Sequence, residues 1–267
     1  MAKITEESRE QFRKEADCYK KRIEESLEKE KNILSVLKSS PGDASYKKLT
    51  LAEEMIYVAT LYIAINGSSL KIMELKNNDA LNDARKMLYK AIIYLEEIVT
   101  NSINIAYSEL AEQMAAIANV PVQKRYMLVQ KLGLAIQMVI DGFGDNSKWK
   151  WSFIELKGRF AVVAKNCLDM RKAAKAYFDP NNEDYETVVL YIRMLIKLLD
   201  ASASGYRDKY ELSTRRIDDM RNGIKFLLAR HKLALALNDA KTAEEIKKKA
   251  LVWKDKMDAD QKSGSSR

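Results

Sequence analysis

The chain has 267 residues, of which 47% are apolar and 31% are charged, so it can bury a sizeable core in one long domain or two packed ones. Nine Gly and three Pro are well below the usual share of about 7% and 5%, and this scarcity of helix breakers excludes a sheet protein with frequent turns. The net charge of +8 comes mainly from residues 148–178 and 205–267, which each carry six more basic than acidic residues. Such blocks suit an anionic partner, but they are also typical of the solvated faces of long helices.

The first expected helix covers residues 4–38. Thr5, followed by acidic residues, is suited to cap its first turn. Apolar residues recur at steps of three and four, which predicts a narrow stripe of the coiled-coil type that Glu30 interrupts. Pro41 ends the helix because proline cannot continue it. The stripe residues are Phe12, Ala16, Tyr19, Ile23, Leu27, Leu34 and Leu37.

The second expected helix covers residues 45–76 and contains an apolar run, residues 55–65. A helix that is apolar on nearly every side must be covered by neighbours, so we expect it at the centre of a bundle. The run itself is shorter than the about 20 residues needed to span a bilayer. The polar segment Asn66–Ser69 is a candidate kink or interruption.

Two further helices are expected on either side of Pro121. The spacing of apolar residues predicts one helix from about Asn78 to about Asn119. Pro121 is well placed in the first turn of the next helix, which should run to about Ile140. The apolar positions of the first of these helices are Leu81, Ala84, Leu88, Ile92, Leu95, Val99, Ile103, Ala106, Leu110 and Met114.

After a glycine-containing turn at 141–147, a fifth helix should run from about 148 to 178, and a sixth from about 182 to 237. Asp179 and Pro180 are suited to begin the sixth helix. Its apolar residues alternate by four and three, and we call this row the seam. At 1.5 Å per residue this helix would be roughly 80 Å long, with a break most expected at 202–205. The seam residues are Ile192, Leu195, Leu199, Ala203, Tyr206, Tyr210, Ser213, Ile217, Met220, Ile224, Leu227, His231 and Ala234, with Gly205 and Gly223 off the seam.

A last helix follows Asn238 and Asp239, and residues 261–267 form a polar tail that we expect to be frayed. The predicted fold is therefore all-α: an elongated, antiparallel, coiled-coil-like bundle of about six or seven long helices. We expect a single elongated domain over residues 1–267, with possible sub-bundles at 1–145 and 146–260.

The residue types disfavour enzymatic chemistry. His231 is the only histidine, and its place on the seam predicts a packed side chain rather than a catalytic base. A di-iron bundle site needs two Glu-x-x-His pairs, which one histidine cannot supply. The sequence also contains no phosphate-binding glycine loop, zinc cluster or calcium loop. We therefore predict no catalytic residue, cofactor or metal; an unpaired buried carboxylate in a closed pocket would revive an enzyme.

Cys18 and Cys167 are far apart and show no metal or redox spacing, so both are predicted to be buried thiols. The N-terminus shows no apolar stretch of the secretory type, which makes a cytoplasmic protein the expectation. A signal removed before residue 1 would leave no trace in this numbering.

The residues predicted to contact a partner lie in two places. Bases alternate with aromatic residues in the first, a pattern suited to a membrane interface or to single-stranded nucleic acid, although such a segment also serves to pin a helix start. The second is the basic last helix, whose lysines are suited to phosphates. The candidates are Lys148, Trp149, Lys150, Trp151 and Phe153, together with Lys247, Lys248 and Trp253.

These features favour a non-enzymatic structural or assembly protein, such as a filament, sheath or scaffold component. It would bind a protein partner or a second copy through long helical seams, with surface Lys and Glu pairs setting the register. A membrane-surface-binding helical dimer is the first alternative, provided that the two basic blocks share a face. A nucleic-acid-associated helical protein is the second, provided that Trp149 and Trp151 are exposed beside that charge. No small-molecule substrate is expected.

Overall fold

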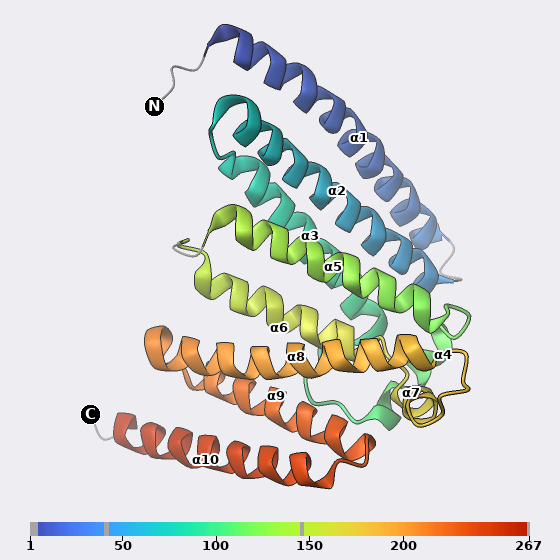
Figure 1. Ribbon diagram of the computed structural model, residues 1–267, viewed down its shortest axis with the longest axis vertical. Coiled ribbons are helices and arrows are strands. Elements are labelled where there is room, and N and C mark those ends of the chain that lie inside the picture. The colour runs from blue at the N-terminus through green and yellow to red at the C-terminus, as the bar shows by residue number, and fades with distance from the viewer. Residues whose placement is uncertain (1–4, 40–42, 145–146, 266–267) are drawn as a thin grey trace. The chain divides into compact units, whose positions relative to one another are not determined.

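The computed structural model describes residues 5–39, 43–144 and 147–265, and within them it contains helices and no strand (Figure 1). The all-α prediction is therefore confirmed, but the expected number of six or seven helices is wrong, because these residues form ten α-helices. The α-helices are α1 (Glu6–Ser39), α2 (Ala44–Met73), α3 (Asn78–Val99), α4 (Ala111–Ala116), α5 (Val122–Phe143), α6 (Lys150–Asn166), α7 (Met170–Tyr177), α8 (Tyr185–Lys209), α9 (Ile217–Ala236) and α10 (Ala240–Ser265). A 3₁₀ turn, η1 (Tyr107–Leu110), precedes α4, and a π-helical turn, η2 (Tyr210–Thr214), follows α8.

The chain forms two compact units, each assembled from separate parts of the sequence. The first unit consists of residues 1–98 and 127–150, and the second of residues 99–126 and 151–267. This division differs from the predicted sub-bundles 1–145 and 146–260, because residues 99–126 pack within the second unit.

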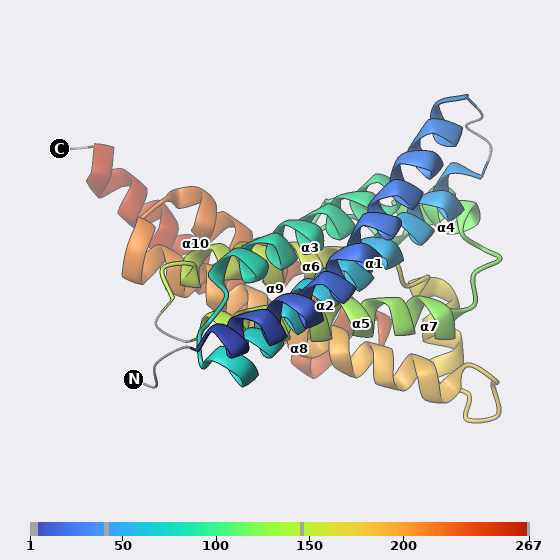
Figure 2. The ribbon, with the colours of Figure 1, turned by 90° about the horizontal axis from the view of Figure 1, so that it is seen from above.

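The centre of the first unit is α2, as its apolar sequence predicts. Its residues Leu51, Met55 and Val58 are fully buried. The preceding helix α1 packs along α2 (Figure 2) and contributes Lys29, which forms an ion pair with Glu54. Only one stripe of α1 is buried, because its other faces carry mixed Glu and Lys that remain in solvent.

Taken over its whole length, α2 is long and apolar enough to cross a membrane. Half of its most apolar stretch is buried inside the structure. A buried helix at the core of a protein has the same length and apolar composition as a membrane-spanning one. The segment Asn66–Ser69 does not interrupt it. Asn66 instead accepts a hydrogen bond from the backbone N–H of Asn77 at 2.9 Å, and Ser69 donates to the carbonyl of Leu75 at 2.7 Å. These polar residues therefore hold the turn between α2 and α3.

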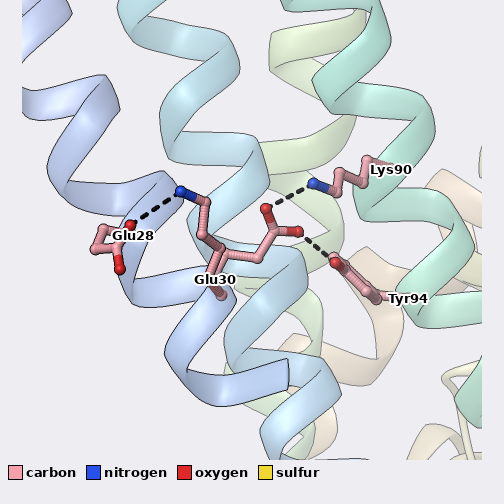
Figure 3. A network of polar contacts seen from close by, with 5 residues as sticks. Glu28, Glu30, Lys90 and Tyr94 are labelled. Carbon is pink, nitrogen blue, oxygen red and sulfur yellow. Dashed lines mark hydrogen bonds and ion pairs between the residues drawn. The ribbon is translucent and has the colours of Figure 1, made fainter. Parts of the chain in front are cut away.

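Glu30, which interrupts the apolar stripe of α1, has its own partners in the first unit (Figure 3). Its carboxylate is buried and accepts hydrogen bonds from the hydroxyl of Tyr94 and from Lys90 Nζ, the latter at 2.6 Å. A buried charge is tolerated only when it is paired in this way. Burial and the hydrogen bond to Glu30 also raise the pKa of Tyr94 well above its usual range, so Tyr94 remains a donor. The network joins α1 to α3.

The predicted single helix from 78 to 119 is wrong, because α3 ends at Val99 and Thr100 adopts a left-handed conformation with φ of 68°. Thr100, Asn101, Ser102 and Asn104 have side chains that compete with the helix for backbone hydrogen bonds. Asn166 of α6 then binds the freed carbonyls of Thr100 and Ser102 at 3.0 and 3.3 Å. The chain becomes helical again only at η1 and α4.

The fifth predicted helix, 148–178, is interrupted at Cys167–Asp169 and forms α6 and α7. Asp169 caps α7 by accepting from the backbone N–H groups of Arg171 and Lys172, both at 3.2 Å. The predicted helix start at Asp179–Pro180 is also wrong. Asp179 accepts instead from the N–H of Asn181 at 3.1 Å in a local turn, and α8 begins at Tyr185.

The predicted continuous helix from 182 to 237 is broken, although not at 202–205. After α8 the chain forms η2, passes through Arg215 with φ of 52°, and returns as α9 packed against α8 (Figure 1). Asp219 stabilises this reversal by accepting from Thr214 Oγ1 at 2.6 Å and pairing with Lys209 at 3.0 Å. Helix α10 then packs on α9.

The seam prediction holds along α8 and in part along α9, where Met220, Leu227 and Ala234 are buried as predicted. Ile192 to Tyr210 are buried where predicted, whereas Ile224 and His231 lie at the edge of the buried face of α9. Gly223, expected off the seam, is buried at the crossing with α8, where an added Cβ would stand 3.2 Å from the carbonyl oxygen of Ala203. Ser213 and Ile217, on either side of the break at Arg215, are exposed and half-buried, so the seam is interrupted there.

Two smaller expectations also change. Cys18 is exposed on α1, so only Cys167 is the buried thiol that was predicted. The tail is helical as far as Ser265, because α10 extends through residues 261–265 that were expected to fray. Residues 266–267 of that tail lie outside the described residues.

Candidate partner-binding surface

The predicted contact residues around the tryptophan pair are divided between the two units. Lys148, Trp149 and Lys150 belong to the first unit, and Lys148 and Lys150 are exposed. Trp149 is half-buried, because the guanidinium of Arg85 lies 3.9 Å from the ring centroid and covers one ring face. That ring face is therefore occupied within the chain, and a nucleic-acid base could stack only on the opposite face of Trp149.

The other predicted residues lie in the second unit. Trp151 is half-buried and Phe153 is buried in α6, so Phe153 serves the core. On α10, Lys247 and Lys248 are exposed, but Trp253 is only 3% exposed and packs near the cations of Arg207 and Lys249. Burial removes Phe153 and Trp253 from the surface, so the predicted partner contact does not hold for these two residues.

The strongest surface feature of the first unit was not predicted: it is an exposed apolar stripe on α5. Met127, Leu134 and Met138 are 52%, 64% and 41% exposed. Their spacing of seven and four residues places all three on one face of the helix. Lys131 falls on the same face. We call these four positions the α5 stripe.

The neighbouring helix α2 widens this surface. Lys131 pairs with Glu53 of α2 at 3.6 Å, which places the two helices side by side at this level. Tyr57 lies one turn after Glu53 on the same side of α2 and is 43% exposed. The surface therefore combines apolar side chains from α2 and α5 around one solvent-exposed ion pair. At its border, Gln137 donates a hydrogen bond to Asp141 at 2.7 Å.

The sequence contained a signal for this surface. Helix α5 carries apolar residues on two faces rather than one, and a helix of that kind must be covered on both sides or expose one of them. Leu128, Leu132, Ala135 and Val139 form the covered face. Which face is covered depends on the neighbouring helices, so periodicity alone could not assign it.

The described residues contain no group of three His, Cys, Asp or Glu side chains positioned to hold a metal ion. Two carboxylates are buried in the described part of the chain, those of Glu30 and Asp219. Glu30 pairs with Lys90 and Tyr94, and Asp219 pairs with Thr214 and Lys209. The condition that would revive an enzyme, an unpaired buried carboxylate, is therefore not met at either residue.

Lys165, a buried lysine in the second unit, helps to hold an irregular segment of the chain in place. Lys165 is 3% exposed and donates to the side-chain oxygen of Asn166, which holds the carbonyls of Thr100 and Ser102. Desolvation, with a smaller effect of Lys232, lowers the pKa of Lys165 to about 8. Lys232 itself donates to the carbonyl of Asn104 at 2.9 Å. Both lysines thus serve the irregular segment 100–106.

The fold and this surface define the chain as an all-α protein of packed helices that exposes an apolar face on one of them. The TP0443 family pattern matches residues 8–261, nearly the whole sequence, and the chain belongs to the TP0443 family. No curated protein and no solved structure matches the chain.

Proposed function

We propose that this chain is a non-enzymatic structural or assembly protein that binds a helical protein partner, or a second copy of itself, through the α5 stripe. The observation that carries the proposal is the exposure of Met127, Leu134 and Met138 on one face of α5. Exposed apolar residues that are scattered singly need no explanation, but residues gathered on one helix face favour a docking site.

The composition of the stripe favours a helix as the partner. Two of its three apolar residues are Met, whose flexible and polarisable side chains adapt to a partner of imperfect shape. An amphipathic helix would present apolar residues at steps of three, four and seven, which matches the spacing of the stripe. The pair of Glu53 and Lys131 would set the register, because charges at an interface select orientation more than they add affinity.

A filament, sheath or scaffold component is the role that we propose for such a binder, with the cytoplasm as its location. Long helices with mixed Glu and Lys on their outer faces, as on α1, give the extended contact surfaces that assembly requires. The proposal needs no catalytic group, cofactor or small-molecule substrate.

The test uses the full chain and two substitutions of equal type. Leu134→Lys places a charge in the stripe, and Leu190→Lys is the matched control, because Leu190 of α8 is also exposed. Light scattering across a concentration series measures self-association. A photo-crosslinking residue at position 134 or 190, introduced in the native cell, detects other partners.

We expect either a doubling of mass that Leu134→Lys abolishes, or a discrete adduct from position 134 that Met138→Lys abolishes. Leu190→Lys should leave both results unchanged, and a crosslinker at position 190 should give no such adduct. A chain that remains monomeric and gives no stripe-dependent adduct would overturn the proposal.

A membrane-surface protein is the second candidate, and a different observation favours it. Leu251 and Val252 are exposed on α10 near Lys247 and Lys248, an arrangement suited to an anionic bilayer surface. Co-sedimentation with phosphatidylserine vesicles, but not with phosphatidylcholine vesicles, would support it. Loss of that binding in Val252→Glu would assign it to α10, and equal sedimentation with both lipids would contradict it.

A further inference from the structure

The second unit contains a cavity of about 140 Å³. Three segments meet around it: the turn before α5 together with the first turn of that helix, the corner between α6 and α7 together with α7, and the start of α8. Its wall combines apolar residues, among them Val122, Ala173 and Val188, with four charged residues, Arg125, Asp169, Lys172 and Asp184. All of the lining residues belong to the second unit, whereas the α5 stripe belongs to the first.

Arg125 lines this cavity and is only 8% exposed. Its Nη1 donates to the carbonyl oxygen of Cys167 at 3.2 Å and contacts Met114 Sδ at 3.7 Å, while its Nε is buried without a hydrogen-bond partner. No carboxylate within the described part of the chain is near enough to form an ion pair with it. A buried guanidinium is stable only when its charge is balanced, and here the chain supplies only neutral acceptors.

None of the other charged groups of the cavity pairs with Arg125: Lys172 is a further cation, exposed on α7, and both carboxylates have other partners. Asp169 is engaged with the first N–H groups of α7, and Asp184 accepts from Gln123 Nε2 at 2.6 Å. The thiol of Cys167 remains neutral, because burial raises its pKa to about 12. The unbalanced charge of Arg125 therefore fits an anion that enters from outside the chain.

The shape and charge of the cavity limit that anion. A cavity of about 150 Å³ accepts a molecule of the size of benzene, so the organic body of the ligand should be no larger than one such ring. Asp169 and Asp184 line the same cavity as the two cations Arg125 and Lys172, so a monoanion is favoured over a dianion such as phosphate. The apolar residues of the wall favour an organic body. A planar carboxylate matches the fork of a guanidinium.

We propose that this cavity binds a small organic monocarboxylate, whose carboxylate pairs with Arg125 and whose branched or aromatic body lies against Val122, Ala173 and Val188. The proposal is independent of partner binding at the α5 stripe, because the two sites belong to different units and use different residues.

Isothermal titration calorimetry on the full chain tests the proposal, with benzoate and isobutyrate as probes. Their uncharged amides, benzamide and isobutyramide, are the matched controls for charge, and inorganic phosphate is the control for ligand class. At least one carboxylate should bind, and its amide should bind at least about tenfold more weakly, since each factor of ten corresponds to about 1.4 kcal/mol of lost interaction.

Two substitutions separate the site from the fold. Arg125→Met removes the charge, and Ala176→Leu fills the cavity while leaving the bond from Arg125 to Cys167 in place. Both should abolish binding, whereas Ala259→Leu on the exposed side of α10 should not change it. Circular dichroism identifies a variant that has not folded. If Arg125→Met does not fold, the binding measurement on Ala176→Leu decides the test.

The proposal is overturned if neither carboxylate binds, if the amides bind equally well, or if Ala176→Leu binds as the unaltered chain does. Tighter binding of phosphate than of both carboxylates would also overturn it, because the carboxylates of Asp169 and Asp184 should disfavour a dianion.

Discussion

Gly158 of α6 lies directly against Tyr206 of α8, so that a Cβ added at Gly158 would stand 2.7 Å from Tyr206 Cε2. The ring of Tyr206 cannot easily retreat, because it stacks on Phe226 of α9 with the centroids 5.7 Å apart. One glycine thus sets how closely α6 approaches the α8–α9 pair.

Gly158→Ala should therefore destabilise the protein even though alanine is the better helix former. Overpacking of a core costs about 1–3 kcal/mol, which exceeds the gain of at most about 1 kcal/mol in helix propensity. Gly67→Ala in α2 is the matched control, since its Cβ would meet no atom within 4 Å, and it should stabilise by roughly 0.5–1 kcal/mol. Urea unfolding followed by circular dichroism measures both, and equal signs for the two variants would contradict the packing argument.

Tyr94→Phe should cost about 1.5–3 kcal/mol, because the buried carboxylate of Glu30 loses a hydrogen bond that it cannot replace with water. The same substitution in a Glu30→Leu background should cost much less, since no charge remains to be satisfied. The measurement is a double-mutant cycle of unfolding free energies. Tyr57→Phe, at an exposed position of α2, is the control and should have almost no effect. Additive costs of Tyr94→Phe and Glu30→Leu would show that the network contributes no coupling.

The stability of the second unit should respond to pH through Lys165. Its pKa of about 8 lies below the ordinary value of 10.5, so between these values the folded chain binds fewer protons than the unfolded chain. Stability should then rise with pH across this window, by up to roughly 3 kcal/mol relative to Lys165→Met. Cys167 acts in the opposite direction, because its raised pKa costs stability as pH rises above about 9, but it is present in both chains and cancels in the difference. A difference that does not change between about pH 7.5 and about pH 10 would contradict the assignment.

The two cysteines should differ sharply in reactivity. Cys18 is exposed, whereas Cys167 is buried with a pKa of about 12, so only Cys18 should react with a disulfide reagent in the folded protein. Thiol titration at about pH 8 should find one fast thiol, a second one only after unfolding, and no fast thiol in Cys18→Ser. Rapid reaction of both thiols without denaturant would show that the α6–α7 corner opens.

The sequence predicted the helices whose ends carry strong signals. Thr5 caps α1 by accepting from the N–H of Ser8 at 3.1 Å, and Asp239 caps α10 by accepting from the N–H of Thr242 at 3.0 Å. The central place of α2 also followed from its composition. These features depend on local chemistry or on total apolar content, and a single sequence contains both.

The breaks within long apolar patterns were not predictable in the same way. The reversal at η2 contains no Gly or Pro, and its only local sign is Thr214 followed by Asp218 and Asp219, which suits a helix start. The apolar spacing continued across it, so periodicity favoured a single helix. The α5 stripe and the charge of Arg125 were missed for a related reason, because both depend on which neighbouring segments cover them.

The path of the chain between the two units has a consequence for synthesis. The chain leaves the first unit after Ile98, returns at Met127, and leaves again after Lys150. The first unit therefore cannot be completed on the ribosome until residue 150 has emerged. Until then, the side of α2 that lies beside α5 in the folded protein remains uncovered. Neither unit corresponds to a continuous piece of the chain, so truncation at any single position leaves at least one of them incomplete. A nascent chain with an incomplete apolar core exposes apolar surface that is prone to aggregation until the core is complete.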